Sequence, residues 1–198
     1  MGPGEGSEEI GVLLQDIPQS ANALGSPSAP VTLQYFGDLE CPFCRDFTLE
    51  VLPAIIQRWV RIGDLRIEYH ALETATRERD VFVAQQVAAL AAGSQDKAWY
   101  YIETFYREQG EEGSGYVTDR FLEGIASEVP ALNVSQWNRD RADPDLADEI
   151  AADEQAAESA GLHGTPSFLI GRNPATMTAF SPTDPASFDT AIERLRET

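Results

Sequence analysis

The sequence predicts an α/β protein in which one sheet, flanked by helices, is interrupted by a block made only of helices. Segments with strand-like apolar patterns occur before residue 71 and return after residue 161. From 79 to 160 the apolar residues recur with helical spacing, and no strand pattern occurs. The two ends together supply the strands of one sheet, so we interpret 79–160 as a helical insertion that covers one end of that sheet.

The first part of the chain leads into the sheet. A short apolar run at Ile10–Leu14 is a candidate edge strand, and Pro18–Pro30, rich in Pro, Ser, Gly and Asn, is predicted to be a loop. Val31–Phe36 has the β-branched and aromatic composition of a strand. We therefore expect residues 1–29 to form an N-terminal extension that carries the candidate edge strand.

A long amphipathic helix is predicted after this strand. Pro53 falls inside it and lacks the N–H that would bond to the Leu49 carbonyl, so we predict a kink there. Gly63 and Asp64 end the helix, and Leu65–His70 alternates as a second strand. The apolar side chains of the helix recur in two adjacent rows, Phe43, Phe47, Val51, Ile55 and Trp59 in one and Cys44, Leu52, Ile56 and Val60 in the other.

The rest of the chain completes the insertion and the sheet. Residues 30–78 and 161–198 are predicted to form the sheet-containing domain. Within the insertion, helices are predicted at Val81–Ala92, at Lys97–Glu108, shortly after Thr118 and at Asp145–Ala160, with a loop at Gln109–Gly115. After Gly161, strands are predicted at Pro166–Gly171 and Ala175–Phe180, and a terminal helix at Asp184–Leu195.

The only two cysteines, Cys41 and Cys44, lie between the first predicted strand and the long helix. Unpaired N–H groups and the helix dipole point at Cys41, which is expected to be exposed and to favour the thiolate. Cys44, one turn further, is expected to be less accessible. A disulfide across so short a loop removes little unfolded-state entropy. The pair is therefore predicted to exchange disulfides rather than to stabilise the fold.

Residues beside the cysteines are expected to tune and present this chemistry. The carboxylates of Glu40 and Asp38 raise the pKa of Cys41, but the N–H groups of the helix lie closer, so we predict a pKa below 7. Pro42 fixes φ at the helix start, where its missing N–H costs nothing. Phe43 presents an apolar surface beside Cys41 for a substrate.

Charge and composition limit the partners. Acidic residues outnumber basic ones 33 to 14, for a formal charge of -19, so nucleic acid and anionic membrane surfaces are disfavoured. No apolar run approaches the ~20 residues of a membrane span. The two histidines, His70 and His163, are isolated, and their spacing from the cysteines fits no zinc motif, so no metal site is predicted.

These features resemble the DsbA-like thiol:disulfide oxidoreductases of the thioredoxin superfamily. The resemblance is carried by Val31–Phe36, by Asp38–Cys44 and by Gly164–Gly171, with a similar lead-in from Ile17 to Thr32. It covers nearly the whole chain, insertion included, and implies a thioredoxin-like fold with a mixed central sheet. The dipeptide between the cysteines is Pro-Phe, whereas the best known oxidases have Pro-His, which leaves the redox poise open.

The resemblance also implies roles for residues and partners. Cys41 would be the nucleophile and Cys44 the resolving thiol, Pro166 would be cis and face the disulfide, and a substrate peptide would pair with the Thr165 backbone. His163 lies three residues before Pro166 and is a candidate modulator of Cys41. The implied partners are reduced or unfolded proteins and a membrane-bound reoxidising protein. The protein is expected to be a monomer without a dissociable cofactor.

The sequence leaves two questions open: in which compartment the protein works, and whether it introduces or reduces disulfides. The chain starts without a signal peptide, yet the absence of further cysteines suits an exported protein, so an extracytoplasmic location with the leader absent from this chain is favoured over a cytoplasmic one. The function favoured is oxidative folding of exported proteins. A cytosolic reductase of the glutaredoxin or thioredoxin type is the first alternative, although the chain offers little positive charge for anionic glutathione. A non-catalytic thioredoxin-fold binding module is the second.

Overall fold

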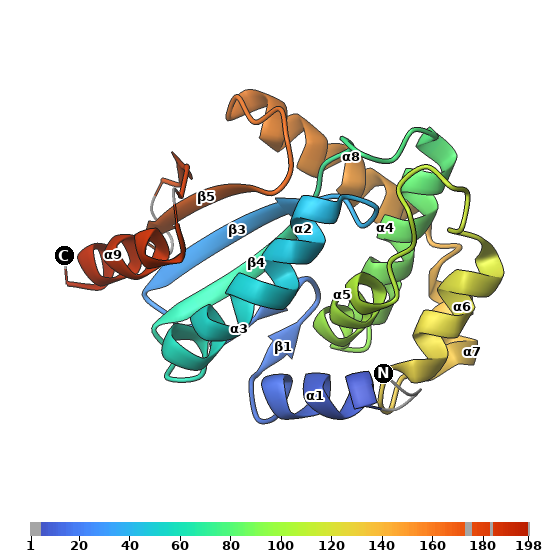
Figure 1. Ribbon diagram of the computed structural model, residues 1–198, viewed down its shortest axis with the longest axis horizontal. Coiled ribbons are helices and arrows are strands. Elements are labelled where there is room, and N and C mark those ends of the chain that lie inside the picture. The colour runs from blue at the N-terminus through green and yellow to red at the C-terminus, as the bar shows by residue number, and fades with distance from the viewer. Residues whose placement is uncertain (1–4, 173–175, 183, 198) are drawn as a thin grey trace.

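A computed structural model describes residues 5–172, 176–182 and 184–197 (Figure 1). In this part of the chain, six strands form one sheet in the order β1-β2-β4-β3-β5-β6. β3 and β4 are parallel and the other neighbours are antiparallel, so the sheet is mixed and the predicted fold class is confirmed. The strands are β1 (Gln19–Ser20), β2 (Ala23–Leu24), β3 (Val31–Gly37), β4 (Leu65–Ala71), β5 (Ser167–Arg172) and β6 (Thr178–Phe180).

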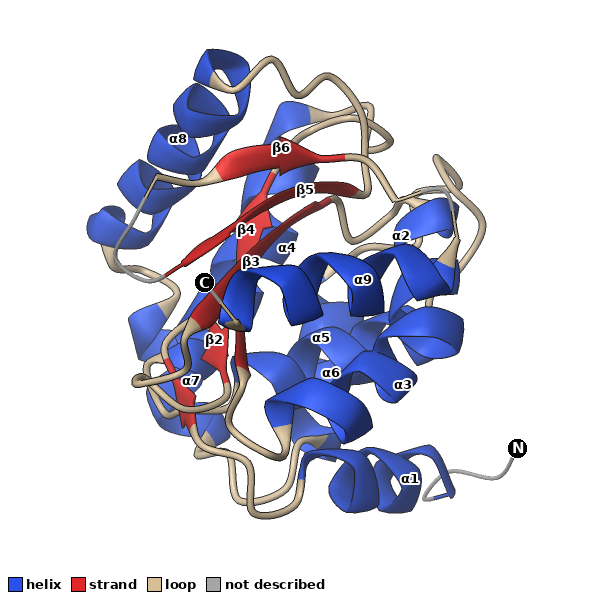
Figure 2. Cartoon of the chain, turned by 90° about the vertical axis from the view of Figure 1, so that its left-hand side faces the viewer, coloured by secondary structure: helices blue, strands red, loops and turns tan. Residues whose placement is uncertain are grey.

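Helices cover both faces of the sheet. Seen along the edges of the strands, α8 lies on one side and α9 and α3 lie on the other (Figure 2). The segment between β4 and β5 contains helices and loops but no strand, as the sequence predicts. The helices are α1 (Glu5–Leu14), α2 (Pro42–Asp46), α3 (Leu52–Ile55), α4 (Arg79–Gly93), α5 (Ala98–Arg107), α6 (Asp119–Glu128), α7 (Val134–Asp140), α8 (Pro144–Ser159) and α9 (Pro185–Arg196), with π-helical turns η1 (Phe47–Val51) and η2 (Ile56–Val60).

Successive side chains of β4 point to opposite faces of the sheet, so this strand packs against helices on both faces. Tyr69 points to one side, where its ring lies edge-on to Trp99 of α5 at 6.5 Å between centroids. His70 points to the other side, where its Nδ1 lies 2.6 Å from Oδ1 of Asp153 in α8. Burial alone would lower the pKa of His70, but the hydrogen bond to Asp153 and the charge of Glu68 raise it to about 9. A charged pair therefore fixes α8 to the sheet.

One continuous apolar core joins the sheet to the inserted helices. Tyr35 of β3, Trp99 of α5 and Trp137 of α7 belong to the same buried cluster. The Trp137 indole donates to the Ala88 carbonyl at 2.8 Å, which fixes α7 against α4. The insertion thus shares its core with the sheet, and the boundaries at 79 and 160 remain a sequence-based prediction.

The predicted edge strand at Ile10–Leu14 is wrong, because this run is the last part of α1. Ile10, Leu13 and Leu14 are buried while Val12 is 69% exposed, which is the i, i+3, i+4 spacing of a helix. The sheet takes its edge from the short strands β1 and β2 instead, within the segment predicted to be a loop. Residues 1–4 of the predicted extension lie outside the described residues.

The distortion predicted at Pro53 takes the form of widened turns. The Leu52 N–H bonds to the Phe47 carbonyl, and the Arg61 N–H bonds to the Ile56 carbonyl at 2.9 Å. Both bonds span five residues rather than four, as in π-helices. These wide turns lie on either side of the proline and accommodate its missing N–H within one continuous helical run.

The C-terminal half differs from the predictions in detail. The helix after Thr118 is α6, capped by the Thr118 hydroxyl, which accepts from the Phe121 N–H at 3.2 Å. The sequence analysis missed α7, which is only seven residues long. The strand predicted from Ala175 begins at Thr178, and Ala175 itself lies outside the described residues. Within the described ranges, no helix combines the length and apolarity needed to cross a membrane.

Candidate redox site

Cys41 and Cys44 lie where β3 ends and α2 begins. Cys41 is the N-cap of α2, with extended φ and ψ of -72° and 120°, and Pro42 occupies the first helical position. Both thiols are free. Cys44 is fully buried, but Cys41 is only 4% exposed, so the prediction that it is exposed is wrong. The Thr165 carbonyl covers it, because it accepts a hydrogen bond from the Cys41 Sγ at 3.5 Å.

The two thiols have opposite proton affinities. A hydrogen bond from the Cys44 thiol is the largest influence on Cys41, and it outweighs the effect of burial. Together with the Thr165 hydroxyl and the amides of Cys44 and Phe43, it lowers the Cys41 pKa to about 6, in agreement with the predicted value below 7. Burial raises the pKa of Cys44 well above its usual range. At neutral pH the pair therefore consists of a Cys41 thiolate and a protonated Cys44.

The loop before β5 brings distant residues to the sulfur. β5 pairs antiparallel with β3, with Ser167 opposite Phe36, so the start of β5 lies at the end of β3 that leads to Cys41. The Thr165–Pro166 peptide bond is cis. This register places Thr165 against Cys41, although the two residues are 124 positions apart in the sequence.

The other predicted site residues are divided between the site and its surroundings. The Phe43 side chain is 69% exposed, next to Cys41 in the sequence. Glu40 is 4% exposed, and burial raises the pKa of its carboxyl while hydrogen bonds from Thr76 and the Gly113 amide oppose the shift. His163 is exposed, and none of the hydrogen bonds described for Cys41 involves it.

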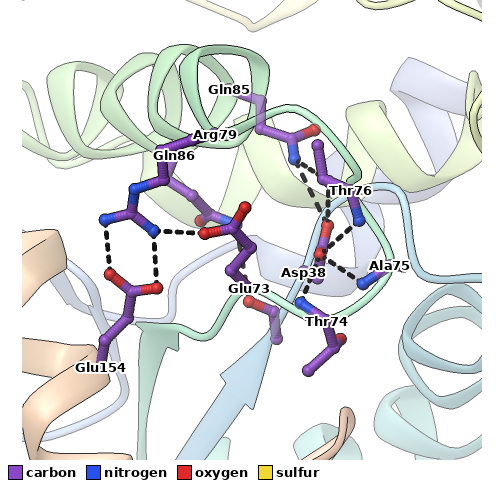
Figure 3. Close-up of polar contacts among 10 residues, drawn as sticks. Asp38, Glu73, Thr74, Ala75, Thr76, Arg79, Gln85, Gln86 and Glu154 are labelled. Atoms are coloured by element: carbon purple, nitrogen blue, oxygen red, sulfur yellow. Dashed lines mark hydrogen bonds and ion pairs between the residues drawn. The ribbon is translucent and has the colours of Figure 1, made fainter.

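Asp38, three residues before Cys41, makes the densest set of hydrogen bonds near the site. Its side chain is fully buried, and its two oxygens accept six hydrogen bonds. Figure 3 shows those from Thr74, Ala75, Thr76 and Gln85. Oδ1 accepts from Glu40 N at 3.0 Å, Thr76 Oγ1 at 2.6 Å and Gln85 Nε2 at 3.3 Å, and Oδ2 accepts from the backbone N of Thr74 at 3.0 Å, Ala75 at 2.8 Å and Thr76 at 2.9 Å.

Hydroxyl and amide groups from β3 and from the insertion also contact the active-site loop. The Tyr35 hydroxyl donates to the Cys44 carbonyl at 3.3 Å, and the Tyr106 hydroxyl donates to the Asp38 carbonyl at 3.2 Å. Gln109 Nε2 donates to the carbonyls of Leu39 at 2.8 Å and Cys41 at 3.2 Å. These contacts fix the backbone on both sides of the cysteine pair, from β3 and from α5 and the loop that follows it.

A cleft opens beside the cis-proline. Its volume is about 400 Å³, and four phenylalanines and three prolines are among the residues that line it. Pro166 is one of the lining residues, and Phe47, Phe168 and Phe188 line the cleft from the long helix, β5 and α9. The cleft is therefore an apolar surface continuous with the residue that follows Thr165.

Comparison with known proteins agrees with this geometry. A family model described as thioredoxin matches residues 19–194. The chain belongs to the thioredoxin family. It is 25% identical over 152 residues to a probable disulfide bond formation protein D of Bacillus anthracis, an alignment that spans 76% of this chain and 70% of that protein.

Solved structures of this family have the same fold. Oxidised BdbD of Bacillus subtilis has a TM-score of 0.75 at 19% identity, over 93% of this chain and all of that one (100%). A thioredoxin-like oxidoreductase of Silicibacter pomeroyi has a TM-score of 0.68 at 26% identity, over 95% and 98% of the two chains. The resemblance predicted from the sequence is confirmed: this thioredoxin-family chain is a DsbA-like thiol:disulfide oxidoreductase.

Several residues of the site escaped the sequence analysis. From the sequence, Asp38 is expected only to oppose the thiolate by its charge, although its position directly after a buried strand also indicates a structural role. Thr74, Gln85 and Gln109 carried no comparable signal, because their contacts with the active-site loop depend on tertiary structure.

Proposed function

We propose that Cys41 and Cys44 are the reacting pair of an enzyme that introduces disulfides into reduced or unfolded proteins. In the oxidised enzyme, a substrate thiolate attacks the Cys41 sulfur, the Cys41–Cys44 bond breaks, and the Cys44 sulfur leaves and takes up a proton. A second substrate thiolate then attacks the substrate sulfur of the mixed disulfide and releases the Cys41 thiolate. Two electrons pass from the substrate to the enzyme, and the reaction requires no cofactor.

The difference between the two thiols carries this proposal. A Cys41 pKa of about 6 makes Cys41 a good leaving group in the second step. It also stabilises the reduced enzyme, because a thiolate one pKa unit below pH 7 favours that form by about 1.4 kcal/mol, or roughly 30 mV. Stabilising the reduced form makes the disulfide a stronger oxidant. This favours donation of disulfides over the reductase alternative.

Substrate would bind along the cis-proline loop and the cleft beside it. A peptide lying antiparallel to Thr165 can pair with the exposed backbone there, which gives affinity without sequence preference. Exposed Phe43 and the aromatic walls of the cleft would take apolar side chains of the same peptide, which an unfolded chain exposes. Thr165, Pro166, Pro42 and Phe43 are therefore the proposed substrate-binding residues, with Glu40 and His163 at the edge of the site.

The names of the relatives support an extracytoplasmic role. Proteins called disulfide bond formation protein D align with three quarters of the chain, and disulfides persist in oxidising compartments. We propose that the protein works outside the cytoplasm as a monomer, and that a membrane-bound partner reoxidises Cys41 and Cys44 after each cycle.

The test is a pair of assays on the same preparation. The oxidised protein should restore activity to a reduced, unfolded protein with several disulfides, and Cys41→Ser should abolish this. Reduction of insulin without gain of refolding activity would instead support the reductase, and failure of both assays would support the binding module. The equilibrium with glutathione gives the reduction potential, and a value at or below that of thioredoxin would contradict the oxidase.

A further inference from the structure

Three loops from separate parts of the chain meet around the Cys41 sulfur. The loop at 38–41 follows β3, the loop at 72–78 follows β4, and the cis-proline loop precedes β5. Because β3 and β4 are parallel and β5 is antiparallel to β3, all three loops lie at the same end of the sheet. Strand pairing alone does not fix loops beyond the last hydrogen bond, so other contacts must hold them together.

Asp38 joins the first two loops. It belongs to the loop that leads to Cys41, and its Oδ2 accepts from three consecutive backbone amides, those of Thr74, Ala75 and Thr76, in the loop after β4. Its backbone is held as well, because the Cys41 N–H donates to the Asp38 carbonyl at 3.0 Å. A fully buried carboxylate that accepts six hydrogen bonds is a rigid connection, since breaking it would leave buried donors without an acceptor.

Thr74 extends this connection to the third loop. Its N–H is bound to Asp38, and its hydroxyl is hydrogen-bonded to the Thr165 hydroxyl. The Thr165 carbonyl in turn lies 3.5 Å from the Cys41 Sγ, where it accepts a hydrogen bond from the protonated thiol, and the Thr165 hydroxyl lowers the pKa of that thiol. The contacts form a closed ring that runs from Cys41 through Asp38, Thr74 and Thr165 back to the Cys41 sulfur.

We propose that Asp38 is a positioning residue for thiol–disulfide exchange, which acts through Thr74 to hold Thr165 against the Cys41 sulfur. The proposal rests on the proposed role of Cys41 as the reacting thiol. Asp38 does not touch the sulfur in this arrangement. It fixes the loop that does, and Thr74 transmits the constraint.

The sign of the change in the Cys41 pKa distinguishes this positioning role from a simple charge effect of Asp38. A negative charge near Cys41 disfavours the thiolate, so removal of the Asp38 charge alone would lower the Cys41 pKa. Release of the ring has the opposite effect, because the Thr165 hydroxyl is one of the groups that lower this pKa. Asp38→Asn removes the charge and leaves one acceptor oxygen for six donors, so it tests both effects at once.

The experiment is a titration of the Cys41 thiolate, by ultraviolet absorbance and by the pH dependence of alkylation, in the reduced protein. For Asp38→Asn we expect the Cys41 pKa to rise by about one unit, the size expected for the loss of one hydrogen bond to a charged group. An unchanged or lower pKa in a folded Asp38→Asn protein would overturn the proposal.

Thr74→Val provides a second test that does not depend on tolerance of the Asp38 substitution. It keeps the N–H that binds Asp38 and removes only the exposed hydroxyl. We expect a smaller rise of the Cys41 pKa, recovery in Thr74→Ser, and no effect of Thr74→Val in a Thr165→Val background. An equal effect in both backgrounds would show that Thr74 does not act through Thr165, and would contradict the proposal.

The matched control is Asp153→Asn. Asp153 is also a buried aspartate that accepts from a backbone amide at the end of β4, that of Ala71 at 2.9 Å, but it holds α8 rather than the cysteine loop. Asp153→Asn should lower the melting temperature of the protein and leave the Cys41 pKa unchanged. A wild-type Cys41 pKa near 9 would remove the basis of the proposed function itself, whereas a low wild-type value that Asp38→Asn does not change would remove only the positioning role.

Discussion

Among the residues that the structure describes, the carboxyl groups of Asp38 and Glu103 are both completely buried, and their hydrogen-bonding environments are opposite. Asp38 accepts six hydrogen bonds, while neither oxygen of Glu103 has a hydrogen-bond partner in the part of the chain that the structure describes. Burial raises the pKa of Glu103 to about 8, and the charge of Arg107 opposes this shift only in part. The comparison shows that a buried acid organises a site where backbone donors converge on it, and otherwise remains protonated at neutral pH.

The largest effect is expected from removal of the Asp38 carboxylate altogether. Asp38→Ala removes the acceptor of six hydrogen bonds, four of them buried, and should lower the free energy of unfolding by about 3–5 kcal/mol. Urea denaturation measures this loss. A loss below 1 kcal/mol would show that water replaces the carboxylate, and Asp38 would no longer differ from Glu103.

Glu103→Gln should instead raise the free energy of unfolding. In the wild type, the folded state holds a proton that the unfolded state releases above about pH 4.5, so stability is highest below that pH and falls as pH rises to about 8. Replacement with Gln should remove this slope and stabilise the protein by about 2–3 kcal/mol at pH 8. The check is urea denaturation of both proteins from pH 5 to 9, in which parallel curves would refute the buried protonated acid.

His70 provides a smaller, separable pH effect. Its folded pKa of about 9 lies above the ordinary 6.5, so the pair with Asp153 contributes full stability below pH 6.5 and loses it as pH rises through about 9. His70→Gln should cost about 2 kcal/mol at pH 6 and almost nothing at pH 10. Hydrogen exchange of α8 would locate the loss, because this helix depends on the pair.

The smallest effect is expected for Tyr106→Phe. This change removes the donor to the Asp38 carbonyl and leaves the six donors to the carboxylate in place. The expected loss is about 1 kcal/mol in the free energy of unfolding, with no change in the Cys41 pKa. A shift of that pKa would mean that the backbone of Asp38, rather than its side chain, determines the position of the cysteine loop.

Local patterns were enough to predict much of this structure. The strands around Val31–Phe36 and Leu65–His70 and the long helix between them follow from periodicity, and the two cysteines define the chemistry. Ile10–Leu14 was misassigned because five apolar residues do not distinguish a strand from the end of a helix, and α1 starts in a polar segment.

The ring around Cys41 could not be predicted in the same way. Asp38 and Thr74 are 36 positions apart, and Thr74 and Thr165 are 91 apart. Only the parallel pairing of β3 with β4 and the return of the chain to β5 bring them together. The same long-range packing covers Cys41, whose exposure was judged from its position at a helix start alone.

The shielding of Cys41 determines which molecules can reach it. Hydrogen peroxide and other small oxidants attack a thiolate in proportion to its accessible surface, and 4% exposure offers them little. Under the proposed function, a peptide that pairs with the cis-proline loop would displace the Thr165 carbonyl from the sulfur as it binds. The low pKa would otherwise make this cysteine vulnerable to over-oxidation. In the proposed role, the cover would keep the Cys41 sulfur reactive toward polypeptides and protect it from small oxidants.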